Sequence, residues 1–135
     1  MILIDSSVWI NYFNGKNSWQ TEILDQMLQQ IPLFTADLIL TEVLQGFRNE
    51  KDYQQAKEIM TILPCKNMGG SKIALQSAEN YRKLRKKGVT IRKTIDVIIG
   101  TFCITENIPL LHDDKDFEPM VKHLGLKTVY HPLVQ

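Results

Sequence analysis

Two short apolar runs stand out along the 135-residue chain, at residues 1–4 and 108–111. Runs of this length, without alternation, are typical of strands covered on both faces of a parallel sheet. Weaker β-prone pieces occur at 33–35, 65–66 and 127–130. The pattern therefore predicts five short strands, each followed by a polar segment or a helix.

Apolar residues spaced three and four apart predict the helices between these strands. The expected helices cover residues 6–14, 19–30, 37–47, 52–63, 71–87, 95–104 and 118–124. In the second helix we expect Ser18 to be the cap, Glu22 to complete a capping box and Pro32 to end the helix. Strands that alternate with helices predict an α/β fold with a parallel sheet and helices on both faces, in a single domain over residues 1–135.

Composition narrows the class of protein. The chain is 44% hydrophobic and 23% charged, which is typical of a globular protein. Cys65 and Cys103 are far apart and form no CxxC pair, so neither a zinc site nor a disulfide framework is expected. No apolar run approaches the roughly 18 residues of a membrane span. We therefore expect a cytoplasmic protein with reduced thiols and no membrane attachment.

The net charge of +1 hides an uneven distribution. Residues 82–93 hold seven cations and no acid, so the rest of the chain carries nine cations against fifteen acids. Such a basic segment fits a polyanionic partner, and it equally fits a solvated helix end whose cations favour the helix dipole. Both interpretations stay open at this point.

Acidic residues follow both apolar runs. Asp5 follows the first run, and Asp113, Asp114 and Asp116 follow the run at 108–111. Because the carboxyl ends of parallel strands meet at one edge of the sheet, these acids are expected to lie close together. Each of them could also simply cap a helix. If Asp5 has a chemical role, the capping is expected to pass to the hydroxyls that follow it, Ser6 and Ser7.

Two further acids lie on apolar helices that can face the same edge. Glu42 interrupts the apolar helix 37–47, where an unpaired buried carboxylate is costly. Asp96 stands near the start of the helix 95–104, where a capping role is an equally good explanation.

Carboxylates that converge on one crevice repel one another, which favours proton uptake or a bound cation. Oxygen ligands without cysteine or a histidine pair favour Mg²⁺ or Mn²⁺ over zinc. Such a site suits metal-assisted hydrolysis of a phosphodiester, with the basic segment holding the polyanion. Packing or a supporting hydrogen bond is a simpler role for His112 than that of general base. The candidate substrate contacts are Ser6, Arg85, Lys86, Arg92 and Lys93.

Four motifs, in this order and spacing, resemble the PIN-domain ribonucleases, specifically the VapC-type toxins of prokaryotic toxin–antitoxin pairs. They are Ile-Asp-Ser-Ser-Val-Trp at 4–9, Thr-Glu-Val-Leu-Gln-Gly at 41–46, Thr-Ile-Asp-Val-Ile-Ile-Gly at 94–100 and Leu-Leu-His-Asp-Asp-Lys-Asp-Phe at 110–117. Family members usually carry Thr or Ser where this chain has His112.

The resemblance implies a three-layer α/β/α sandwich with a central parallel sheet of order 3-2-1-4-5. It implies a Mg²⁺-dependent endoribonuclease that acts on RNA such as tRNA or rRNA, forms a homodimer and is neutralised by a VapB-type antitoxin whose tail lies across the site. It also implies a set of metal-binding acids, namely Asp5, Glu42, Asp96 and Asp114, with Asp116 as a fifth acid near the metal.

Other classes of protein explain the sequence less well. A flavodoxin-like phosphoacceptor domain needs an acid after the third strand, where residues 67–70 read Asn-Met-Gly-Gly. A haloacid-dehalogenase-like phosphatase needs a second Asp two residues after the first, where Ser7 stands. A non-catalytic RNA- or protein-binding module of the same fold stays open if the acids are only helix caps.

Overall fold

The computed structural model describes residues 1–30 and 33–132 of the chain. The expected helices are all present, with ends shifted by a few residues, and the expected stop at Pro32 lies outside the described residues. They are α1 (Ser6–Phe13), α2 (Trp19–Gln30), α3 (Asp37–Gln45), α4 (Glu50–Ile62), α5 (Ser71–Lys86), α6 (Thr94–Glu106) and α7 (Glu118–Leu124). A single 3-10 turn, η1 (Lys115–Phe117), precedes α7.

The strands are shorter than the apolar runs suggest. They are β1 (Leu3–Ile4), β2 (Thr35–Ala36), β3 (Cys65–Lys66) and β4 (Leu110–Leu111). β1 pairs with β4 and β2 pairs with β3, and both pairs are parallel, as expected for an α/β fold. Within residues 1–30 and 33–132, no ladder joins β1 to β2. The strand expected at 127–130 is reduced to one parallel bridge between Leu110 and Thr128.

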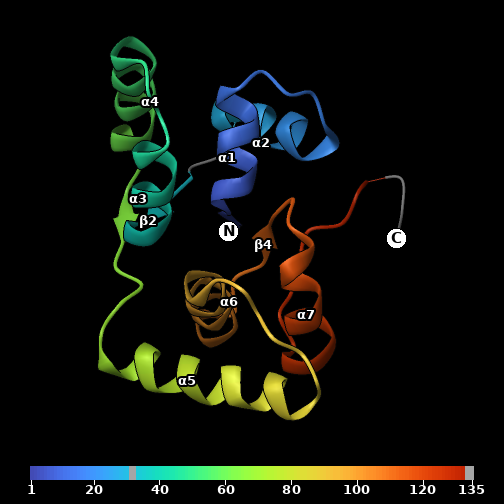
Figure 1. Ribbon diagram of the computed structural model, residues 1–135. Coiled ribbons are helices and arrows are strands. Elements are labelled where there is room, and N and C mark those ends of the chain that lie inside the picture. Colours follow the sequence, from blue (N-terminus) through green and yellow to red (C-terminus); the bar gives the residue numbers. More distant parts are fainter. Residues whose placement is uncertain (31–32, 133–135) are drawn as a thin grey trace.

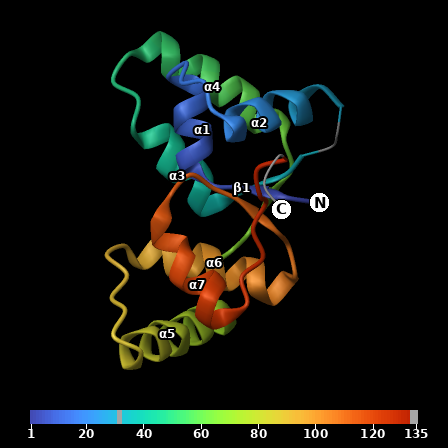
Figure 2. The same cartoon turned by 90° about the vertical axis from the view of Figure 1, so that its right-hand side faces the viewer.

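The short strands lie between two groups of helices. Helices α1 to α4 gather on one side of the molecule, and α5 to α7 gather on the other (Figures 1 and 2). The residues of β1 and β4 are almost completely buried, which explains why their sequences are uninterrupted apolar runs. In the part of the chain that is described, no helix combines the length and the apolar character needed to cross a bilayer.

Helix α6 packs closely against its neighbours because of one glycine. A Cβ added at Gly100 would lie 2.3 Å from Cε and 2.6 Å from Sδ of Met120, so a larger residue there would push the end of the Met120 side chain aside. Seven residues of α6 are buried, among them Asp96 in its first turn. The tight packing therefore fixes the position of that carboxylate.

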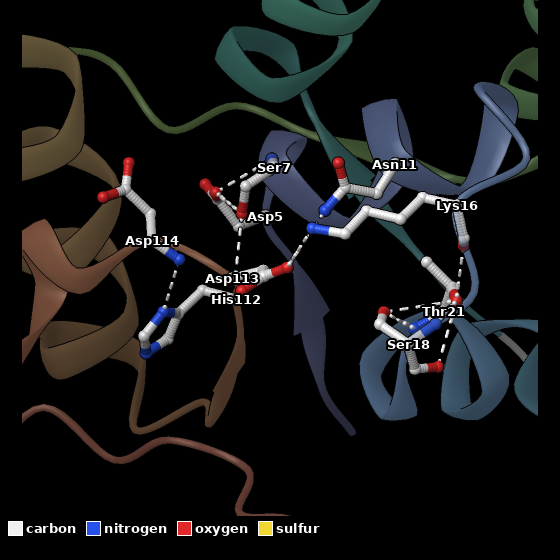
Figure 3. A network of polar contacts seen from close by, with 9 residues as sticks. All are labelled: Asp5, Ser7, Asn11, Lys16, Ser18, Thr21, His112, Asp113 and Asp114. Atoms are coloured by element: carbon white, nitrogen blue, oxygen red, sulfur yellow. Dashed lines mark hydrogen bonds and ion pairs between the residues drawn. The ribbon is translucent and has the colours of Figure 1, made fainter.

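Two helix caps differ from expectation. Asp5 itself caps α1, because its side chain accepts a hydrogen bond from the backbone N–H of Ser7, so the predicted transfer of capping to Ser6 or Ser7 is wrong. At α2, Ser18 forms a reciprocal capping box with Thr21 rather than with Glu22 (Figure 3). Thr21 stands three residues after Ser18, which is the spacing that a capping box requires.

Candidate metal centre

The predicted acids come to one edge of the sheet from separate parts of the chain. Asp5 directly follows β1, and its backbone N–H donates to the carbonyl of Leu111 at the end of β4 over 2.9 Å. Asp114 lies in the loop after β4, and Asp96 lies in the first turn of α6. The parallel pairing of β1 with β4 therefore brings the exits of the two strands together.

Three carboxylates lie close enough together for one cation to contact all of them. One oxygen each of Asp96, Asp114 and Asp116 lies within 4.8 Å of the others. An ion with ligand distances of about 2.0–2.6 Å can bridge oxygens at such separations. Among the described residues this is the group that meets the distance condition, and it does not include Asp5 or Glu42.

Asp5 and Glu42 act on this group through their charges. Burial raises the pKa of Asp96 to about 7, and the negative charges of Asp5, Asp114 and Glu42 add to the increase, while Lys93 opposes it. Burial also raises the pKa of Asp5 and the pKa of Glu42. Near neutral pH, the cluster therefore gains from binding a proton or a cation.

Two buried carboxylate oxygens have no hydrogen-bond partner among the described residues, Asp5 Oδ1 and Asp96 Oδ2. An unpartnered buried acceptor is costly unless something positive meets it. Burial raises the pKa of the Cys103 thiol to about 12, which keeps it protonated and unsuited to bind a metal. The oxygen-only donor set fits Mg²⁺ or Mn²⁺.

Two serine hydroxyls hold the acids in place. Ser7 Oγ donates to Asp5 Oδ2 over 2.6 Å and accepts from the backbone N–H of Asp113 over 3.0 Å (Figure 3). Ser6 Oγ donates to Glu42 Oε1 over 2.9 Å. The role of Ser7 was missed at the sequence level, where its hydroxyl was considered only as a cap and Ser6 as a cap or a substrate contact.

The neighbouring acids after β4 have different roles. Asp113 turns away from the cluster and accepts from Asn11 Nδ2 over 3.0 Å, with Lys16 Nζ 3.6 Å away (Figure 3). His112 Nδ1 accepts from the backbone N–H of Asp114 over 3.2 Å. Burial lowers the pKa of His112, so its ring is neutral and carries its proton on Nε2.

The four basic candidate substrate contacts divide into two groups. Arg92 Nη2 lies 3.5 Å from Asp116 Oδ2, and the charge of Lys93 lowers the pKa of Glu42 and of Asp96, so both cations belong to the site. Arg85 and Lys86 lie in the last turn of α5, and no described contact joins them to the carboxylates. The structure thus brings only part of the basic segment to the metal-binding edge.

The chain is similar to proteins of one family. The sequence model of the PIN domain matches residues 2–122. Ribonuclease VapC11 of Mycobacterium tuberculosis is 26% identical over 130 residues, which cover 95% of this chain and 97% of that protein.

Solved structures agree. VapBC2 from Rickettsia felis, bound to a DNA fragment from its promoter, has a TM-score of 0.75 at 17% identity over 96% of this chain and 98% of that chain. Mycobacterium tuberculosis VapC20, a toxin that cleaves the sarcin–ricin loop, has a TM-score of 0.64 at 14% identity. The match covers 87% of this chain and 93% of that chain. At such identities the structural likeness shows a shared fold.

Proposed function

Because the chain belongs to the PIN domain family, we propose that it is a VapC-type toxin, an endoribonuclease that hydrolyses RNA phosphodiester bonds with a divalent cation. The observation that carries this proposal is the group of three carboxylate oxygens, from Asp96, Asp114 and Asp116, within 4.8 Å of one another. Asp114 also caps η1, because it accepts from the backbone N–H of Asp116 over 2.9 Å. Capping gives no reason for Asp96 of α6 to meet these two acids, so the cluster favours chemistry over capping.

In the proposed site, Asp96, Asp114 and Asp116 hold Mg²⁺ or Mn²⁺, and Asp5 and Glu42 complete its acidic wall. The two unpartnered buried oxygens, on Asp5 and Asp96, support this assignment. A cation bound there would lower the pKa of a water molecule and neutralise charge on the scissile phosphate.

The remaining residues position these groups. Ser7 fixes one oxygen of Asp5 and leaves the other without a hydrogen-bond partner among the described residues, and Ser6 orients Glu42. Since the Ser6 hydroxyl already donates to Glu42, we assign it a positioning role in place of a direct substrate contact. Arg92 and Lys93 would meet the phosphates beside the cut.

More distant phosphates fall to the C-terminal end of α5, where Arg85 and Lys86 are exposed. The RNA would then run from the acidic edge along this basic segment, and its affinity would fall as salt rises. We leave the target as an RNA such as tRNA or rRNA.

The finer architecture and the partners follow the same proposal. A sheet of order 3-2-1-4-5 accommodates the pairs β2–β3 and β1–β4 and the bridge from β4 to Thr128. We further propose that residues 1–135 form a single domain, that the protein is a cytoplasmic homodimer, and that a VapB-type antitoxin neutralises it. Structural neighbours of the chain include toxin–antitoxin complexes, which supports the last point.

The test is digestion of a defined pool of total RNA, followed by mapping of the cut ends. Wild-type protein should cleave with Mg²⁺ and stop cleaving with EDTA, and Asp96→Asn should be inactive because a ligand is lost. Asp113→Asn is the matched control, since this acid lies in the same loop but contacts Lys16 and Asn11. RNA binding without any metal-dependent cleavage would instead support a non-catalytic module.

A further inference from the structure

A pocket of about 550 Å³ opens beside the candidate metal centre. It forms where the start of α2, the loop after β4, helix α7 and residues 128–131 meet. Asp114 belongs both to its wall and to the three-carboxylate group, so the two sites adjoin. The volume lies within the range of about 300–1,000 Å³ that is usual for small-molecule sites.

Gln20 gives this pocket a polar side chain that has no hydrogen-bond partner among the described residues. Gln20 is only 8% exposed, and it lines the pocket. Within the described ranges no residue hydrogen-bonds its amide, and the amide atoms themselves remain accessible from the pocket. The capping box of Ser18 and Thr21 fixes the turn of α2 that carries it. The amide is therefore held ready to donate to and accept from a ligand.

His112 adds a second polar group, in which one ring nitrogen accepts a hydrogen bond and the other donates. Its Nδ1 accepts from the backbone N–H of Asp114, so the neutral ring must carry its proton on Nε2. The ring lines the pocket and packs against Phe117, with the ring centroids 5.0 Å apart. Figure 3 shows the ring turned away from the Asp114 carboxylate. The pocket is thus lined by an N–H donor on His112 as well as by the Gln20 amide.

The rim supplies aromatic surface and charges of both signs, because Asp113, Asp114 and Glu118 line the pocket together with two lysines. The Trp19 ring is half-buried at the pocket wall, and Tyr130 is 64% exposed. Lys115 and Lys122 line the same pocket, and neither has an ion pair in the part of the chain that is described. Aromatic faces stack on unpaired bases, and lysines contact phosphates as point charges.

We propose that this pocket binds the unpaired base of the nucleotide next to the RNA bond that is cut. Gln20 and His112 hydrogen-bond the edge of the base, Trp19 or Tyr130 stacks on its face, and Lys115 and Lys122 contact the flanking phosphate. The proposal rests on the proposed function and adds to it a subsite for base recognition. A peptide would also fill an apolar pocket, but hydrogen-bonding groups, aromatic faces and lysines beside a metal-binding acid favour a nucleotide.

The test is a titration of the isotope-labelled protein with each of the four 5′-mononucleotides in the presence of Mg²⁺, followed by NMR. At least one nucleotide should shift the Trp19 indole and the Gln20 side-chain amide signals in a saturable way. The indole of Trp9, buried in the core, is the internal reference and should not move. Gln20→Leu keeps the size of the side chain and should weaken binding about tenfold, as expected for loss of hydrogen bonds to a base.

Gln26→Leu, an exposed position on the same helix, is the matched control and should bind like wild type. If Gln20→Leu does not fold, His112→Phe takes its place with the same expected loss. The proposal is overturned if no nucleotide shifts Trp19 up to about 10 mM, or if the variant binds as tightly as wild type. A peptide that shifts Trp19 when no nucleotide does would also overturn it. Because the titration needs no cleavage, an inactive enzyme that still binds the nucleotide would reject the proposed function and leave the pocket intact.

Discussion

Replacing Asp96 by asparagine should stabilise the protein in the absence of metal. Asp96 is buried, one of its oxygens has no partner within the described part of the chain, and the charges of Asp5, Asp114 and Glu42 surround it. Asparagine keeps the shape of the side chain and removes the charge. The variant therefore loses a proposed metal ligand while it relieves the repulsion that this ligand causes.

The size of the effect follows from the pKa. The pKa of Asp96 rises from 3.8 to about 7 in the folded protein. Each unit corresponds to about 1.36 kcal/mol, so the upper limit is about 4 kcal/mol. Between about pH 4 and pH 7 the folded state holds a proton that the unfolded state has lost, so the free energy of unfolding of the wild type falls as pH rises. Above about pH 7 Asp96 is ionised in both states, so its destabilising effect has reached its full size and no longer changes with pH.

Urea unfolding of both proteins in EDTA, at intervals from about pH 4.5 to pH 8, measures this difference. The advantage of Asp96→Asn should be small at the acid end and grow to between about 1 and 4 kcal/mol at pH 8. An Asp113→Asn control, which removes an exposed carboxylate, should change stability by less than about 0.5 kcal/mol. Equal stabilities at pH 8, or a variant that is weaker throughout, would refute the reasoning.

Three further outcomes are expected. Ser7→Ala removes the hydroxyl that donates to Asp5 and accepts from the backbone N–H of Asp113, so it should cost about 1–2 kcal/mol in urea unfolding and lower the rate of RNA cleavage. Ser7→Thr should restore the stability and the cleavage rate. Gly100→Ala should cost about 1–3 kcal/mol because its Cβ would overlap Met120, and a smaller residue at 120 should recover part of the loss. Mg²⁺ at about 100 times its dissociation constant should stabilise wild type by about 2.7 kcal/mol and Asp96→Asn far less.

Each of these has a clear contrary result. A Ser7→Ala protein with unchanged stability and cleavage would show that the hydroxyl bridge has no consequence. A Gly100→Ala protein as stable as wild type would show that the end of the Met120 side chain can turn away from the new Cβ at no cost. Equal stabilisation of wild type and Asp96→Asn by Mg²⁺ would place the cation elsewhere.

The helices and the α/β class could be predicted from the sequence, because apolar spacing and buried runs report directly on burial. The expectation of parallel strands is confirmed by both observed pairs. The length of the strands could not be predicted, since apolar residues such as Ile2 pack in the core without joining a ladder. The reduction of residues 127–130 to a single bridge depends on how the chain leaves α7, which no local pattern encodes.

At the site, the sequence could indicate which acids end strands but not which of them face inward. Asp113 and Asp114 are neighbours, yet one pairs with Lys16 and the other joins the three-carboxylate group. Which carboxylate faces inward depends on the turn after β4 and on the reach of Lys16, a residue nearly one hundred positions away. Whether the predicted residues bind metal or substrate stays a prediction until it is measured.

The pairing of β1 with β4 determines when the acidic edge can form while the chain is being synthesised. Leu3 pairs with Leu110, so the contact joins opposite parts of the chain, and such non-local pairing forms slowly and late. While the chain is being synthesised, Asp5 emerges long before Asp96 and Asp114, and an incomplete chain has no partner for β1. A nascent chain therefore cannot assemble the acidic edge until residues 96–116 have emerged from the ribosome, which delays any nuclease activity until then.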